Sequence, residues 1–223
     1  MAGQTDPQLS PPRHWRSPWT SLGIGALAAL ATGAIALMVV LLLRPPAFAG
    51  TVLAPPRDIR DFELADQLGR PTRLSELSDG VVVLTFLYTH CPDVCPLTTA
   101  KLHLAYTLLG KDASRVTLLA VTIDPERDTQ ARLFEWSQQA DMLDKWRFLT
   151  GAQAQLQPMW DYYWVGAERA EAAGGQKPTT PDSSYVVEHS VALHLIARGQ
   201  VQVVFGESFQ APDLVHDLRL LLR

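Results

Sequence analysis

The two cysteines of this chain, Cys91 and Cys95, constrain its fold more than any other feature. An apolar, β-branched and aromatic run over 81–88 precedes them, which is typical of a strand buried on both faces. Apolar residues at helical spacing follow over 97–109. Two cysteines cannot build a disulfide framework. Their place where a strand leads into a helix favours one functional pair over two packed apolar side chains.

The rest of the chain alternates strand and helix patterns. A second buried strand is predicted over 116–123, and the residues 124–129 end it and cap a helix whose apolar face includes Leu133. This order indicates an α/β fold, and the position of the cysteines makes it thioredoxin-like. Further expected elements are a hairpin over 62–74, a strand over 146–149, a helix over 156–163, a long loop over 169–184, a hairpin over 191–205 and a helix over 212–222.

The N-terminal part predicts a membrane anchor. Residues 22–43 contain no charged side chain and are long enough to cross a bilayer as a helix. Ala47-Phe48-Ala49 resembles a signal-peptide cleavage site, but the apolar run is longer than that of a signal peptide. Arg13 and Arg16 place the N-terminus in the cytoplasm. The expected parts are a disordered tail over 1–21, the anchor over 22–43, a linker over 44–58 and the thioredoxin-like domain over 59–223.

The chemistry of the cysteine loop favours copper. The positive end of a helix lowers the pKa of a thiol and favours the thiolate, which selects Cu(I), zinc or iron–sulfur clusters. Structural zinc needs about four ligands, and an iron–sulfur cluster about four cysteines. Two sulfurs and one nitrogen satisfy Cu(I), and the same set serves Cu(II) with a further weak ligand. A net charge of −4 without basic blocks gives no signal of nucleic-acid binding.

Six histidines are candidates for the nitrogen ligand. His90 adjoins Cys91, but successive strand residues point to opposite faces, which favours a packing role for its ring. His189 lies between the long loop and the last hairpin, at a strand entry that can reach the helix N-terminus of such a fold. The residues alone leave His189 open as a ligand or a structural histidine. The other four lie in the tail, inside helices or inside a strand: His14, His103, His194 and His216.

Four segments of the chain carry a family resemblance: Phe86–Pro96, Thr122–Thr129, Phe148–Gly151 and Glu188–Ser190. Together they resemble the Sco/SenC family, membrane-anchored copper-binding proteins that help assemble cytochrome c oxidase. The resemblance runs from about Phe62 to the C-terminus and includes the anchor. It implies one copper per monomer, held by Cys91, Cys95 and His189.

Three acidic or basic positions qualify the resemblance. Asp124 ends the second buried strand, so it is expected near the cysteine loop, either as a helix cap or as a residue beside the metal ligands. The family usually has Asp where this chain has Glu188, and an aromatic residue is common where it has His194. Glutamate keeps the acidic group next to His189 but gives it a longer reach.

The resemblance implies a copper chaperone that delivers copper to the Cu-A site of cytochrome c oxidase subunit II by ligand exchange. It further implies a bacterial inner-membrane protein with its C-terminal domain in the periplasm, a periplasmic copper donor and a thiol reductase as partners. The alternative is a thiol–disulfide oxidoreductase that keeps the acceptor cysteines reduced, so enzymatic activity stays open. A peroxiredoxin-like peroxidase ranks third, because Leu84 and Tyr88 stand where its Pro and Thr or Ser would precede Cys91.

Overall fold

The computed structural model describes residues 30–40, 47–77, 79–166, 168–171, 185–188 and 192–223. The chain divides into two units, Met1–Pro46 and Ala47–Arg223. In the first unit residues 30–40 are helical, and the tail and the remainder of the expected anchor lie outside the described residues. Among the described residues, no helix has both the length and the apolar character required to cross a bilayer.

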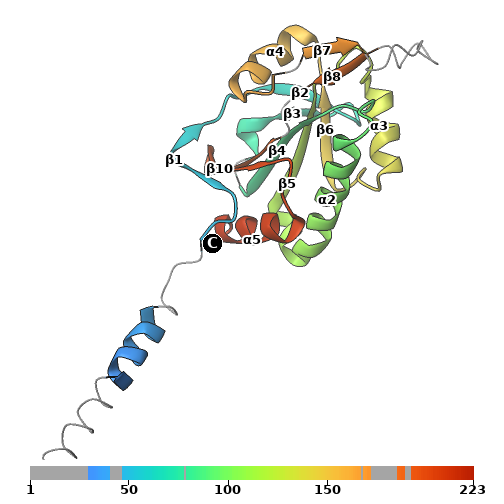
Figure 1. Ribbon diagram of the computed structural model, residues 1–223. Helices are drawn as coiled ribbons and strands as arrows, with labels where there is room; N and C mark the ends of the chain where they lie inside the picture. Colours follow the sequence, from blue (N-terminus) through green and yellow to red (C-terminus); the bar gives the residue numbers. More distant parts are fainter. Residues whose placement is uncertain (1–29, 41–46, 78, 167, 172–184, 189–191) are drawn as a thin grey trace, which may run out of the picture. The chain divides into compact units, whose positions relative to one another are not determined.

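The second unit is built on an eight-stranded mixed sheet (Figure 1). Its strands are β1 (Thr51–Asp58), β2 (Glu63–Asp66), β3 (Pro71–Arg73), β4 (Val81–Leu87), β5 (Val116–Thr122), β6 (Trp146–Thr150), β9 (Ala192–Ala197) and β10 (Gln200–Gly206). They lie in the order β1-β10-β9-β4-β5-β6-β2-β3. The central strands β4, β5 and β6 are parallel, and the flanking strands pair antiparallel. Every residue of β4 is buried, as its continuous apolar sequence predicts.

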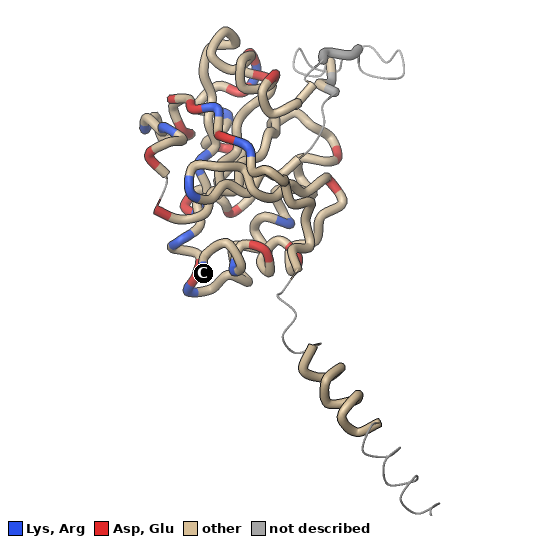
Figure 2. The backbone as a smooth tube through the Cα atoms, turned by 90° about the vertical axis from the view of Figure 1, so that its left-hand side faces the viewer, with Lys and Arg blue, Asp and Glu red and all other residues tan. Residues whose placement is uncertain are grey.

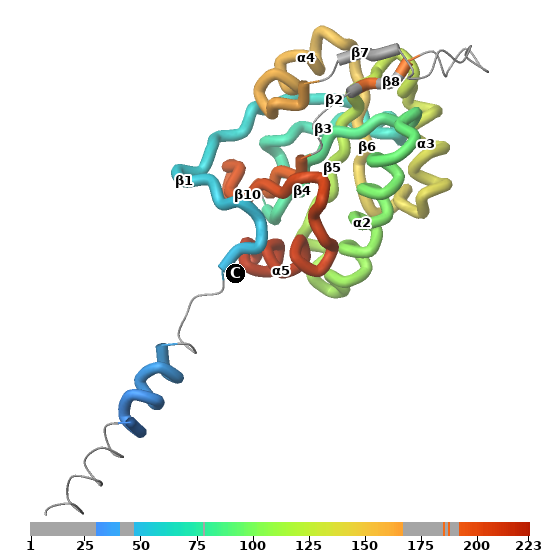
Figure 3. The backbone as a smooth tube through the Cα atoms, in the orientation of Figure 1, coloured from blue at the N-terminus to red at the C-terminus, as the bar shows by residue number. Residues whose placement is uncertain are grey.

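Helices connect and cover the strands. Helix α2 (Val94–Leu109) leads from β4 to β5 and packs beside α5 (Ala211–Leu221), as Figure 3 shows. The hydroxyl of Thr129 accepts a hydrogen bond from the N–H of Arg132 at 3.3 Å and caps α3 (Gln130–Gln139). Helix α4 (Gln153–Tyr162) follows β6, and 3-10 turns span Leu74–Glu76 and Gly110–Arg115. A separate two-stranded sheet pairs β7 (Glu168–Glu171) with β8 (Tyr185–Glu188).

The folded unit begins earlier than the sequence predicts. The segment 51–58, expected to belong to the linker, is β1, an edge strand that pairs with β10. Its register shifts between Val52 and Arg57, where the prolines cannot donate hydrogen bonds to the neighbouring strand. The sequence of this segment therefore lacks the alternation of apolar and polar residues that predicts a strand. Just before β1, the buried carboxylate of Asp217 accepts the N–H groups of Ala49 and Gly50 at 2.8 and 2.9 Å. The candidate cleavage site is thus hydrogen-bonded to α5.

Helix α2 is oriented differently from what its leucine spacing suggests. The residues Leu97, Leu104 and Leu108, which the sequence places on one helical face, are exposed. The buried face is formed instead by a set that includes two threonines: Cys95, Thr98, Thr99, Leu102, Ala105 and Leu109. Because the helix is apolar on both faces, leucine spacing alone could not fix which face packs on the sheet.

Candidate metal and thiol site

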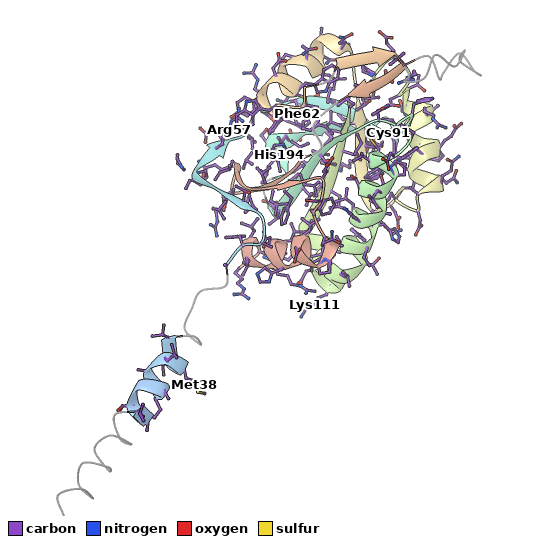
Figure 4. All side chains as sticks on the ribbon, viewed as in Figure 1. Met38, Arg57, Phe62, Cys91, Lys111 and His194 are labelled. Atoms are coloured by element: carbon purple, nitrogen blue, oxygen red, sulfur yellow. The ribbon has the colours of Figure 1, made fainter. Side chains whose placement is uncertain are left out.

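The cysteine loop lies at the carboxyl end of β4. Cys91 is in the loop and partly exposed, whereas Cys95 is in the first turn of α2 and buried. Figure 4 shows Cys91 at the opposite end of α2 from Lys111. The sulfur of Cys91 accepts the backbone N–H of Cys95 at 3.4 Å, one of the amide groups that a helix leaves without an internal partner. The two cysteines are not joined by a disulfide. The helix N-terminus therefore favours negative charge at Cys91.

The Cys95 thiol holds its proton more tightly than an ordinary thiol, because its pKa is raised. The Cys95 thiol donates a hydrogen bond to Cys91, and this bond, followed by burial, raises the pKa of Cys95. Ionisation of one sulfur thus disfavours ionisation of the other at neutral pH. A soft cation that binds both sulfurs must displace this proton, so metal binding here releases a proton to solvent.

Tyr88 links the cysteine loop to β8. Its hydroxyl accepts the backbone N–H of Val187 at 3.2 Å and is hydrogen-bonded to the side chain of Cys91. Burial raises the pKa of Tyr88 to about 12, so at neutral pH the hydroxyl keeps its proton and can donate it to the Cys91 sulfur. Val187 precedes His189 by two residues. The backbone of Val187 is therefore linked to Cys91 through a single side chain, that of Tyr88.

Asp124 is part of a buried cluster that holds β8. Its carboxylate accepts the hydroxyl of Tyr185 at 2.7 Å and forms an ion pair with Arg127. The guanidinium of Arg127 donates to the carbonyl of Tyr185 at 3.1 Å and stacks on the tyrosine ring at 3.7 Å. Arg127 also lies 5.9 Å from the ring of Tyr88. Asp124 thus contacts Arg127, which lies near Tyr88, and it contacts β8 through Tyr185.

Asp128 holds the start of the cysteine loop through hydrogen bonds. Its buried carboxylate accepts the N–H of Thr89 at 3.1 Å and the hydroxyls of Thr89 and Thr122, each at 2.6 Å. Burial raises the pKa of Asp128, and the hydrogen bonds from the two threonines oppose that shift. Thr89 precedes Cys91 by two residues, so this carboxylate fixes the start of the cysteine loop.

The histidines fall into separate environments. His189 lies outside the described residues, although its neighbour Glu188 ends β8. In the described part of the chain, no three His, Cys, Asp or Glu residues form a group that could hold a metal ion. The Nδ1 atom of His90 lies 3.1 Å from the hydroxyl of Thr89. His103 contacts Asp141 at 3.0 Å, at the surface.

His194 is buried in the sheet. Its ring lies 6.4 Å from that of Phe86 and 5.1 Å from that of Tyr163. Within the described residues, its Nε2 atom has no hydrogen-bond partner. Burial lowers the pKa of His194 to about 4, with a smaller contribution from the charge of Arg57. This histidine is neutral at physiological pH.

Comparison with known proteins decides the family. Residues 53–223 match the SCO1/SenC family. The chain belongs to the SCO1/SenC family. A SCO2-like protein of Rickettsia felis is 31% identical over 172 residues, which are 75% of this chain and 80% of that protein. The mitochondrial SCO2 homolog of Bos taurus is 33% identical over 139 residues, which are 61% of this chain and 49% of that protein. The chain thus spans about half the length of this mitochondrial relative.

A solved relative confirms the fold. The structure of Bradyrhizobium japonicum ScoI with copper bound superposes with a TM-score of 0.62 at 27% identity, and covers 73% of this chain and 98% of that chain. The thioredoxin-like α/β fold predicted from the strand and helix order is therefore correct for the Sco-family domain. Sequence reasoning did not single out Tyr88, Arg127 or Tyr185 as site residues. Tyr88 and Arg127 lie inside the family segments 86–96 and 122–129, whereas Tyr185 carries no signal until the fold brings it beside Asp124.

Proposed function

We propose that this Sco-family protein is a membrane-anchored copper chaperone that delivers copper to the Cu-A site of cytochrome c oxidase subunit II. The observation that carries the proposal is the hydroxyl of Tyr88, which bonds both to Cys91 and to the backbone two residues before His189. The proposed ligands are Cys91, Cys95 and His189, with Asp124 acting through Tyr185. The copper held by Bradyrhizobium japonicum ScoI supports the choice of metal.

The residues of this chain fit copper as a cargo. Two adjacent sulfurs, one partly exposed, offer soft ligands to an incoming Cu(I) ion. The proton of the Cys95 thiol leaves as the ion binds and returns as the ion departs. Transfer proceeds by ligand exchange, in which an acceptor cysteine first replaces the partly exposed Cys91. The oxidation state of copper does not change in this step.

The proposed location is the bacterial inner membrane, with a single anchor over 22–43 and the domain in the periplasm. Tethering confines the chaperone to the same surface as a membrane-bound acceptor, which raises their effective concentration. In this compartment a copper donor would load the protein. A thiol reductase would return an oxidised Cys91–Cys95 pair to the dithiol that binds copper.

The asymmetric exposure of the thiols also supports thiol–disulfide exchange as a second candidate. The accessible Cys91 would attack a disulfide of the acceptor and form a mixed disulfide. The buried Cys95 would then release the acceptor as a dithiol and leave a Cys91–Cys95 disulfide. Two electrons pass from the chaperone to the acceptor. This chemistry does not require His189, which separates the two functions.

Copper titration of ligand variants tests the proposal. The full chain in detergent, reduced and free of oxygen, is expected to bind roughly one Cu(I) in competition with a chelator. Cys91→Ser and Cys95→Ser should abolish this site, and His189→Ala should weaken it at least about tenfold. His103→Ala, on the surface beside Asp141, is the control and should bind like the wild type. Equal affinity of His189→Ala and wild type would reject the three-ligand site and favour the oxidoreductase.

A further inference from the structure

The outer face of α2 is apolar and exposed. Leu97, Leu104 and Leu108 are 54, 49 and 43% exposed. They lie on one side of the helix, because spacings of seven and four residues are close to whole turns of an α-helix. A helix at the surface of a domain usually presents polar residues to water. A contiguous apolar strip of this kind indicates a surface that another molecule covers.

The charge pattern of α2 supports the same conclusion. Its 16 residues include one charged side chain, Lys101. The ammonium group of Lys101 donates to the carbonyl of Glu207 at 3.1 Å and lies 5.0 Å from the ring of Phe209. This cation is therefore drawn to the β10–α5 loop. Elsewhere on the folded unit, Lys, Arg, Asp and Glu residues are interspersed along the chain (Figure 2).

An uncharged groove also lies along α2, close in sequence to the thiols. The groove has a volume of about 280 Å³ and runs between α2 and α3. Its lining contains no charged residue: Pro96, Thr99, Ala100, Trp136, Gln139 and Ala140. Pro96, which lines the groove, directly follows Cys95 and is exposed together with Leu97, so the groove opens at the end of α2 that carries the cysteine loop. A cavity of this size accommodates an apolar side chain of a partner.

We propose that this face, defined by Leu97, Leu104, Leu108 and the groove beginning at Pro96, is the docking surface for the protein that receives copper. The inference rests on the proposed chaperone function. Ligand exchange requires the acceptor cysteines to touch Cys91, so the acceptor must lie over the cysteine loop. The surface that continues from that loop is the apolar face of α2, and the acceptor covers it with apolar side chains.

Introducing a negative charge on this face tests the proposal. The probe is the soluble Cu-A domain of oxidase subunit II from the same organism, mixed with the copper-loaded full chain in detergent. Leu104→Glu and Leu108→Glu should each slow copper transfer at least about tenfold, because a charge is buried on docking. Their copper content and affinity should match the wild type, since neither leucine contacts a thiol. The wild-type rate should change little with added salt, because the surface is uncharged.

Leu68→Glu provides the matched control. Leu68 is 43% exposed, like Leu108, but lies in the turn between β2 and β3, and its variant should transfer copper at the wild-type rate. Wild-type transfer by Leu104→Glu would overturn the docking surface alone. The docking surface would also be overturned if a variant lost dimerisation or binding to lipid vesicles but still transferred copper at the wild-type rate. A wild-type chain that binds copper but transfers none would instead overturn the proposed function.

Discussion

Replacing His194 with phenylalanine is expected to stabilise the protein by about 2 kcal/mol more at pH 5 than at pH 8. Burial lowers the pKa of His194 to about 4, from 6.5 in an unfolded chain. The unfolded state therefore binds a proton that the folded state excludes. The stability of the wild type is intact above pH 6.5 and falls as the pH drops toward 4. Phenylalanine removes this loss, because it has no proton to bind.

The site of His194 suits an aromatic hydrocarbon. Phe86 and Tyr163 already contact the imidazole edge-on, so a phenyl ring keeps these contacts and removes a polar atom without a described partner. Urea denaturation of the full chain between pH 5 and 8 measures the effect. His103→Phe, at the surface, serves as the control and should lack the gain at pH 5. An equal stabilisation by His194→Phe at both pH values would show that the buried imidazole is not the titrating group.

Replacing Asp128 with alanine is expected to lower the free energy of unfolding by about 3 kcal/mol. The substitution leaves three buried donors without their acceptor, the N–H and hydroxyl of Thr89 and the hydroxyl of Thr122. Each unsatisfied buried group costs on the order of 1 kcal/mol or more. Since Thr89 begins the cysteine loop, the loop should also become more susceptible to hydrogen exchange.

The isosteric variant Asp128→Asn separates shape from charge. Its side-chain oxygen can still accept from Thr89, so we expect less than half of the loss caused by alanine. Burial raises the pKa of Asp128 above 3.8, so the wild type loses stability as the pH rises through the folded pKa. The stability of the Asn variant relative to the wild type should therefore be highest at neutral pH. A loss below about 1 kcal/mol for Asp128→Ala would contradict the role of this carboxylate.

The sequence predicts the centre of the fold better than its edges. Strands β4 and β5 were predicted nearly to the residue, because continuous β-branched runs leave few alternatives to a buried parallel strand. Strand β1 was missed, because its prolines hide the pattern and its partner β10 lies far along the chain. The orientation of α2 was undetermined, because apolar residues on both faces remove the signal that distinguishes them.

The site shows the same division between local and tertiary information. The cysteine pair and its helix follow from adjacent residues, so they were predicted correctly as a strand–helix junction. The bond from Val187 to Tyr88 joins residues 99 positions apart and has no local signature. The same holds for the contact of Tyr185 with Asp124, across 61 positions. Only the folded chain shows that β8 is held beside the thiols.

X-ray absorption at the copper edge tests the central claim most directly. In the copper-loaded full chain, the account predicts scattering from two sulfurs and one imidazole nitrogen. The nitrogen contribution should disappear in His189→Ala, while both sulfur contributions remain. A wild-type spectrum that contains sulfur scattering alone, unchanged in His189→Ala, would contradict the three-ligand site.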